Sequence, residues 1–138
     1  MGKTNYAFRT ELDLSYKETL ERVKEELQAE GFGVLTEVDV EKVMDEKLGV
    51  KFRPYTIIGA YNPPLSSRAF NTNLEAGLVL PCNVIIYEQE GKSVVVIADP
   101  VTMISTIGDP RLDEVANEAR IRLQRAIEKI EKLPVNSS

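Results

Sequence analysis

Histidine is absent from this chain of 138 residues, and cysteine occurs only once, as Cys82. Without histidine there is no Ser–His or Cys–His catalytic pair, no HExxH zinc site, and none of the side chain that most often acts as a general base near neutral pH. A single cysteine cannot form a disulfide within the chain, which fits a reducing compartment. Carboxylates and one thiol leave Mg²⁺ or Ca²⁺ as the conceivable metals, and we expect neither a metal site nor a cofactor.

Long apolar runs and an excess of positive charge are also missing. No apolar stretch approaches the ~20 residues that a membrane-spanning helix needs, and the start, MGKTNYAFRTELDL, lacks the pattern of a secretory signal. The net charge is −5, whereas binding to phosphate backbones needs a concentrated Lys/Arg surface. We therefore expect a cytoplasmic protein with no nucleic-acid partner and no membrane partner.

Motifs that bind phosphates or hold a nucleophile are missing as well. The sequence contains no GxSxG, GxxxxGKS/T or GxGxxG motif, and Gly31-Phe32-Gly33 precedes a predicted strand rather than a helix. Hydrolase, P-loop and dinucleotide-binding chemistry therefore have no support in the sequence.

What the chain does contain is the pattern of one α+β domain. Hydrophobic residues make up 43% of it, enough for a core without metals or disulfides. Alternating or apolar runs predict strands, and periodic apolar stripes between caps predict helices. The expected strands are residues 5–12, 32–39, 55–61, 83–88 and 93–98, the last two forming a hairpin, and the expected helices are 15–31, 40–48, 65–74 and 110–133.

This order predicts a two-layer fold with a largely antiparallel sheet of about five strands. The two longer helices pack on one face of it, and short helices lie between strands. We expect a single domain over residues 1–138, with an ordered core over about 4–133 and a disordered C-terminal tail.

The last three predicted strands carry apolar side chains on both faces, so the second face of the sheet needs a cover. The helices at 40–48 and 65–74 are one possible cover, and an apolar ligand or a second subunit are others. Because large exposed apolar patches are rare on monomers and symmetric dimers are common, we expect a homodimer.

Seven residues are candidates for a site. Glu37 and Asp39 lie two apart on a predicted strand and could act as acid and base, although Asp39 also suits the cap of the next helix. Cys82 suits a buried strand better than a reactive thiol, since no cation neighbours it in sequence. The others lie at or near strand ends, where phenols and amides meet apolar surface: Tyr55, Tyr61, Asn62 and Asn83.

Four segments resemble a known family: GFGVLTEVDV, KLGVKFRPYTIIGAYNPP, GLVLPCNVIIYE and VVVIADP. In their residues and in their order along the chain they are similar to the bacterial and archaeal domain of unknown function 302. The resemblance implies a fold of the TATA-binding-protein-like, helix-grip type and assigns no activity. The family's usual GACNP stands here as Gly59-Ala60-Tyr61-Asn62-Pro63, so a two-cysteine redox or metal site is not available to this chain.

The sequence thus favours a non-enzymatic homodimer that binds a small, partly apolar molecule. We expect the site where Tyr55, Tyr61, Asn62, Cys82 and Asn83 approach one another. One alternative is an enzyme of unassigned type that uses Glu37, Asp39 and Cys82. Another is a structural subunit that completes the sheet of a different protein.

Overall fold

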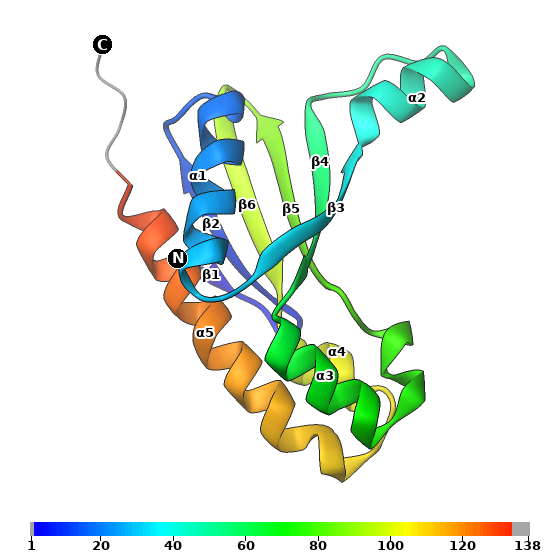
Figure 1. Ribbon diagram of the computed structural model, residues 1–138. Coiled ribbons are helices and arrows are strands. Elements are labelled where there is room, and N and C mark those ends of the chain that lie inside the picture. The colour runs from blue at the N-terminus through cyan, green and yellow to red at the C-terminus, as the bar shows by residue number, and fades with distance from the viewer. Residues whose placement is uncertain (1, 134–138) are drawn as a thin grey trace.

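The computed structural model, which describes residues 2–133, contains one antiparallel sheet with the strand order β1-β2-β6-β5-β4-β3 (Figure 1). The strands are β1 (Gly2–Lys3), β2 (Ala7–Leu12), β3 (Gly33–Asp39), β4 (Tyr55–Tyr61), β5 (Cys82–Gln89) and β6 (Lys92–Ala98). The predicted α+β class is confirmed. The prediction missed β1, because a strand of two residues is too short to show alternation.

Two long helices cover one face of the sheet. They are α1 (Tyr16–Ala29) and α5 (Asp113–Glu131), and they contact each other. The expected capping box opens α1, where Ser15 Oγ accepts a hydrogen bond from the Glu18 amide at 3.1 Å. The long helix expected from Pro110 is divided, because a 3₁₀ turn, η2 (Pro110–Leu112), precedes α5.

The shorter helical segments are α2 (Val40–Leu48), α3 (Pro63–Thr72), η1 (Leu74–Leu78) and α4 (Pro100–Ser105). The helix predicted at 65–74 begins earlier, because the Asn62 side chain caps it and proline suits its first turn. The predicted disorder of residues 135–138 lies outside the described residues.

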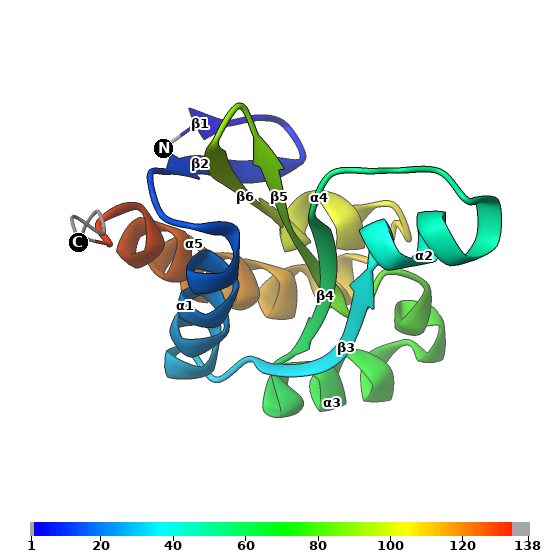
Figure 2. The same cartoon turned by 90° about the horizontal axis from the view of Figure 1, so that it is seen from above.

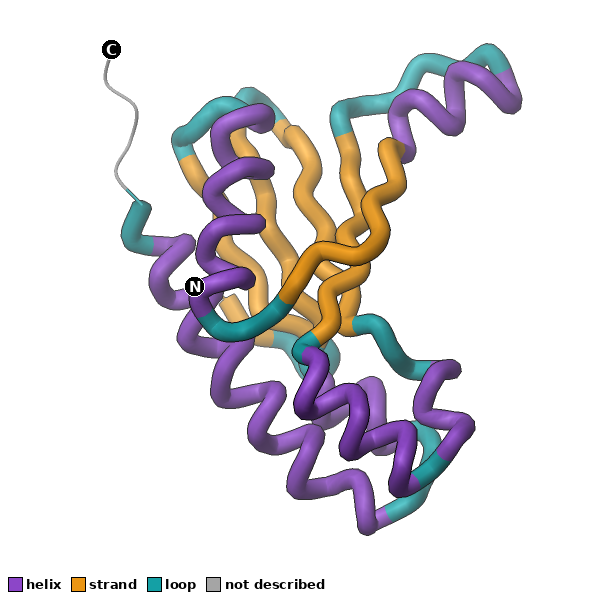
Figure 3. The backbone as a smooth tube through the Cα atoms, viewed as in Figure 1, coloured by secondary structure: helices purple, strands orange, loops and turns teal. Residues whose placement is uncertain are grey.

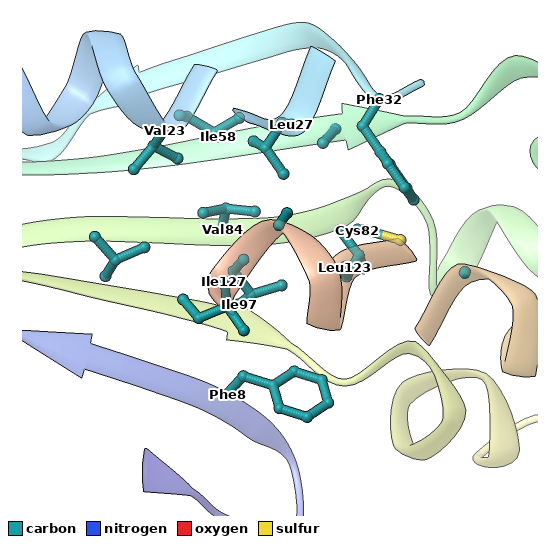
Figure 4. Close-up of a cluster of buried hydrophobic side chains, with 14 of the residues drawn as sticks. Phe8, Val23, Leu27, Phe32, Ile58, Cys82, Val84, Ile97, Leu123 and Ile127 are labelled. Carbon is teal, nitrogen blue, oxygen red and sulfur yellow. The ribbon is translucent and has the colours of Figure 1, made fainter. Parts of the chain in front are cut away.

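The core lies between the sheet and the two long helices, as Figure 4 shows. Side chains of 0% exposure come from both layers: Phe8, Ile58, Val84 and Ile97 from the sheet, and Val23, Leu27, Leu123 and Ile127 from the helices.

A β-bulge interrupts β3. The pairing of β3 with β4 shifts between Val34 and Thr36, so Leu35 is an extra residue whose side chain is 66% exposed. An extra residue reverses the alternation of the strand beyond it. Glu37 therefore turns toward α1, where its Oε1 lies 2.7 Å from Lys24 Nζ. The alternation of faces that a regular strand over residues 32–39 predicts is therefore interrupted at Leu35.

Beyond β3 the chain leaves the sheet. The segment formed by α2 and the loop after it, residues 40–54, is called the arm here, and it projects away from the β3–β4 edge of the sheet (Figures 1 and 3). Asp39 Oδ1 caps α2 by accepting from the Lys42 amide at 3.0 Å, and Gly49 ends the helix in the left-handed conformation. Although both ends are well capped, α2 contains no buried residue.

Candidate functional site

The face of the sheet opposite α1 and α5 is open. Ile57, Ile85 and Val96 are paired neighbours on three adjacent strands, and all three are half-buried there. We call this surface the open face. The expected covers do not reach it, because α2 buries none of its residues and α3 packs against α5 on the other side. The interpretation that the helices at 40–48 and 65–74 hide the second face is therefore wrong.

Aromatic rings occupy one end of the open face. The rings of Tyr55 and Tyr87 stack with their centroids 5.4 Å apart, and Phe52 lies 6.1 Å from Tyr55 in a tilted contact. Burial raises the pKa of Tyr55, and Tyr87 raises it further. Arg9 donates to Glu11 at 3.0 Å, and interactions with Glu11 and then with the Tyr87 hydroxyl raise the pKa of Arg9. This end is therefore an aromatic surface with a fixed cation beside it.

Two adjoining hollows occupy the other end. One has a volume of about 230 Å³ and the other about 170 Å³, and both are lined by Asn83, Ala98 and Met103. The remaining walls are formed by Leu78, Val79, Leu80, Pro81, Cys82, Pro100 and Thr106 in the first hollow, and by Tyr6, Ala7, Ile85 and Val96 in the second. We call the two together the Asn83 hollow.

The Asn83 carboxamide is the distinctive polar group of this hollow. It is exposed, and within residues 2–133 it has no hydrogen-bond partner. The Thr106 hydroxyl, by contrast, already donates to the Met103 carbonyl at 2.6 Å. A carboxamide offers two N–H donors and an acceptor oxygen. The hollow thus presents a free donor and acceptor within an otherwise largely apolar wall.

Cys82 adjoins Asn83 in sequence, but its thiol points into the core. Its side chain belongs to the buried cluster and is 8% exposed (Figure 4). Burial raises the pKa of the thiol to about 11. Because the thiolate is the nucleophilic form, this cysteine is unreactive at neutral pH. The prediction that Cys82 is a core residue is confirmed.

Asn62 is fully engaged in holding the backbone. Its Oδ1 accepts from the Leu65 amide at 3.3 Å and its Nδ2 donates to the Glu30 carbonyl at 3.4 Å. The side chain therefore joins the start of α3 to the end of α1, and at 6% exposure it offers little to a ligand. Tyr61, one residue earlier, is half-buried at the end of β4 opposite Gly33.

Glu37 and Asp39 lie at the opposite end of β4. Asp39 pairs with Thr56, whereas Cys82 pairs with Ala60, a separation of four residues or ~13 Å along the strand. Glu37 is paired with Lys24, and Asp39 caps α2. The structure therefore does not bring these two carboxylates together with the Cys82 thiol.

The charges of these carboxylates act on the pKa of Tyr16. Its hydroxyl shares a short hydrogen bond with Thr56 Oγ1. Burial raises the pKa of Tyr16, and the negative charges of Asp39, Glu41 and Glu37 raise it further. Sequence reasoning missed this contact, which joins residues far apart in the chain.

The seven candidate residues thus fall into separate places. Tyr55 lies on the open face at the end opposite Asn83, since β4 spans ~20 Å from Tyr55 to Tyr61. The expectation of one cleft that gathers Tyr55, Tyr61, Asn62, Cys82 and Asn83 is wrong in its geometry. Cys82 and Asn83 both line the hollow, and of these two only Asn83 is exposed. Met103, Ile85 and Val96 were missed, although the apolar pattern on both faces of their strands had indicated the surface.

Metal and membrane features are absent from the part of the chain that the structure describes. No three His, Cys, Asp or Glu side chains in residues 2–133 group closely enough to hold a metal ion. No helix in that range is sufficiently long and apolar to cross a membrane.

Comparison with known proteins supplies the family. The model of the family described as domain of unknown function DUF302 matches residues 8–130. A crystal structure of an uncharacterised conserved DUF302 protein from Bacillus stearothermophilus is 30% identical, with a TM-score of 0.85 over 92% of this chain and 99% of that chain. No curated protein matches the sequence. The chain therefore belongs to the DUF302 family, as its four motif segments had indicated.

Proposed function

We propose that this DUF302 protein is a cytoplasmic, non-enzymatic homodimer that binds a small, partly apolar molecule in the Asn83 hollow. The observation that carries the proposal is an unpaired carboxamide in a largely apolar depression on an uncovered sheet face. Ligand sites combine apolar walls with a few polar groups that fix orientation, and this hollow has that composition.

The free groups of Asn83 define the ligand chemistry. A molecule with a donor and an acceptor side by side, such as a primary amide, a lactam or a protonated carboxylic acid, can form two hydrogen bonds with one carboxamide. Its apolar part then contacts Met103, Ala98 and the adjoining sheet residues Ile85 and Val96. A strongly charged ligand has no counter-ion here, because Asn83 and Thr106 are the hollow's polar side chains apart from the Tyr6 phenol.

Binding without catalysis agrees with the chemistry of the side chains. The Cys82 thiol has a pKa of about 11 and lies in the core. Glu37 and Asp39 are engaged in an ion pair and a helix cap at the other end of β4. The alternative of an enzyme built from these three residues therefore has no common site to support it.

The second alternative, a subunit that completes another protein's sheet, depends on the free edge of β3. This strand pairs with β4 alone among the described strands. The bulge at Leu35 argues against strand addition, since bulges are one means by which proteins protect sheet edges.

Amide chemical shifts test the ligand proposal. A screen with small amides, lactams and short carboxylic acids is expected to shift signals of residues 78–85 and 96–106. Asn83→Leu should abolish those shifts, whereas Asn117→Leu, which alters an exposed asparagine on α5, should leave them unchanged. Shifts confined to the exposed side of α5, or shifts that survive Asn83→Leu, overturn the proposed site.

Sedimentation equilibrium tests the homodimer independently. We expect a particle of about twice the 15.4 kDa chain mass at micromolar concentration. A monomer that persists at high protein concentration overturns the dimer and leaves the ligand test intact.

A further inference from the structure

The sequence of α2 is amphipathic, as in a helix that packs on an apolar surface, yet none of its residues is buried. At 100° per residue, Val40, Val43, Met44 and Leu48 fall within an arc of ~140°, which makes an apolar stripe along α2. Val43 is 41% exposed and Leu48 is 71% exposed. A capped, amphipathic helix with no buried residue is typical of an element whose cover lies outside its own chain.

The chain's own loop does not supply that cover. Residues 50–52 return along α2 and enclose a depression with Glu41, Lys42 and Asp45. By the same helical spacing Glu41 lies ~20° beyond Leu48, at the edge of the stripe, and Asp45 and Lys42 lie further round the polar side of the helix. The loop therefore borders the stripe on its Leu48 side and leaves Val43 and Leu48 exposed, whereas Val40 and Met44 are half-buried.

The open face is likewise an apolar surface without a cover. Ile57, Ile85 and Val96 form an apolar row across three strands, and the stacked pair Tyr55 and Tyr87 continues it at one end. Strands lie ~4.8 Å apart, so the row across three of them spans ~10 Å, and a helix of nine residues, ~14 Å long, is long enough to cover it. Figure 2 shows α2 on the opposite side of β3 and β4 from α1, which is the side of the open face.

We infer that a second copy of this chain covers the open face, with the apolar stripe of α2 from each protomer packed on the open face of the other. The inference rests on the homodimer proposed above and names its interface. One two-fold axis then satisfies both unpartnered surfaces of both protomers, because the stripe and the face belong to the same chain. A different partner would have to cover the two surfaces separately.

The exposed apolar area is sufficient for such an interface. The arm and the adjoining part of β3 expose Leu35, Val38, Val43, Leu48, Val50 and Phe52 by 41–71%. At ~150–200 Å² for a large side chain, these residues and the half-buried open-face residues offer on the order of 700 Å² per protomer. A standard stable interface buries ~800 Å² per partner. The partner's arm would also form the missing outer wall of the Asn83 hollow, which adjoins Ile85 and Val96.

Charge placed on the stripe tests the interface. Val43→Glu combined with Leu48→Glu is expected to raise the dimer dissociation constant at least ~100-fold, because both carboxylates would have to be buried. Since α2 buries none of its own residues, the variant should keep the wild-type circular dichroism. Its unfolding midpoint should equal that of wild type measured at protein concentrations too low for dimerisation. The matched control is Ile121→Glu on α5, where the side chain is 55% exposed, and it should leave dimerisation unchanged.

Cross-linking tests the exchange itself. Chains carrying Val43→Cys are mixed with tagged chains carrying Ile85→Cys, both with Cys82→Ala, and treated with a short bis-maleimide. The expected product joins one chain of each kind. If the double glutamate variant dimerises as tightly as wild type, or if the mixture yields no product between the two kinds of chain, this interface is wrong. Either result leaves the proposed homodimer unaffected. A monomeric wild-type protein removes the homodimer and this interface together.

Discussion

Glu30 Oε1 lies 3.1 Å from Arg125 Nε, and this ion pair joins the end of α1 to α5. The Glu30 side chain is 8% exposed and that of Arg125 is 54% exposed, so an enclosed carboxylate meets a cation at the surface. Lys129 Nζ, at 3.9 Å from Oε2, is a second cation. The Glu30 carbonyl accepts from Asn62 and Arg122, each at 3.4 Å, so this residue at the end of α1 contacts both α5 and the start of α3.

Removal of the charge at Glu30 should therefore destabilise the fold. We expect Glu30→Gln to lower the free energy of unfolding by ~1–3 kcal/mol, below the cost of breaking a fully buried pair because Arg125 stays hydrated. Urea unfolding of this variant beside Glu25→Gln, an exposed glutamate on the same helix, measures the difference. Equal midpoints for the two variants would show that the pair contributes nothing to stability.

The buried thiol of Cys82 should make stability depend on pH in the alkaline range. The pKa is raised from 9.0 to about 11 in the folded protein, so the unfolded chain loses its proton first. The contribution of the protonated thiol to the free energy of unfolding is fully present below pH ~9 and is lost as pH rises toward ~11. Cys82→Ala should cost ~1 kcal/mol at pH 7 through lost packing, and the difference from wild type should shrink between pH 9 and 11.

Denaturant unfolding of both proteins is measured across pH 7–11. The difference between the two removes the titration of tyrosines and lysines, which both proteins share. Native-state alkylation provides a separate check, since a core thiol reacts slowly until the chain unfolds. Rapid alkylation of the folded protein would contradict the buried placement.

Local signals predicted most elements correctly, and long-range geometry explains the failures. Ser15 and Asp39 cap helices through contacts with residues three positions away, so the sequence contains the whole interaction. The bulge at Leu35 depends on pairing with β4, which no local pattern reveals. Neighbouring residues in a strand face opposite sides, so Cys82 and Asn83 could have been assigned to different surfaces from sequence alone.

The remaining difference concerns distance along a strand. Tyr55 and Tyr61 were grouped because both lie at strand ends, although a strand of seven residues separates its ends by ~20 Å. The unpaired state of Asn83 could not be predicted, because it depends on which side chains of β6 and α4 surround it. Ile85 and Val96 were indicated only as members of strands that are apolar on both faces.

The stacked tyrosines should stabilise the sheet beyond their separate contacts. Tyr55 and Tyr87 face each other as a cross-strand pair, and such aromatic pairs contribute ~0.5–1.5 kcal/mol beyond area burial. We expect a double-mutant cycle of Tyr55→Leu and Tyr87→Leu to give a coupling energy in that range. Thermal unfolding at low protein concentration measures it. Additive effects would show that the rings stack without mutual stabilisation.

Gly59 permits close packing of two elements on the open side of β4. A Cβ atom at this position would clash with Thr36 Oγ1 and would lie 2.8 Å from Pro81 Cγ. Thr36 belongs to the bulged strand and Pro81 precedes β5, so a Cβ here requires the Thr36 hydroxyl to rotate away and the ring of Pro81 to shift. Gly59→Ala should therefore cost ~1–3 kcal/mol, in the range of overpacked cores, and should disturb the β3–β4 pairing.

Gly33→Ala is the matched control, because a Cβ at Gly33 meets nothing within 4 Å on the same pair of strands. It should leave the free energy of unfolding within about 0.5 kcal/mol of wild type or raise it, since alanine reduces the entropy of the unfolded chain. Hydrogen exchange of the β3 amides separates the two outcomes, with faster exchange expected for Gly59→Ala alone. Equal stability of the two variants would mean that Thr36 and Pro81 can yield, and that glycine at position 59 is not required by packing.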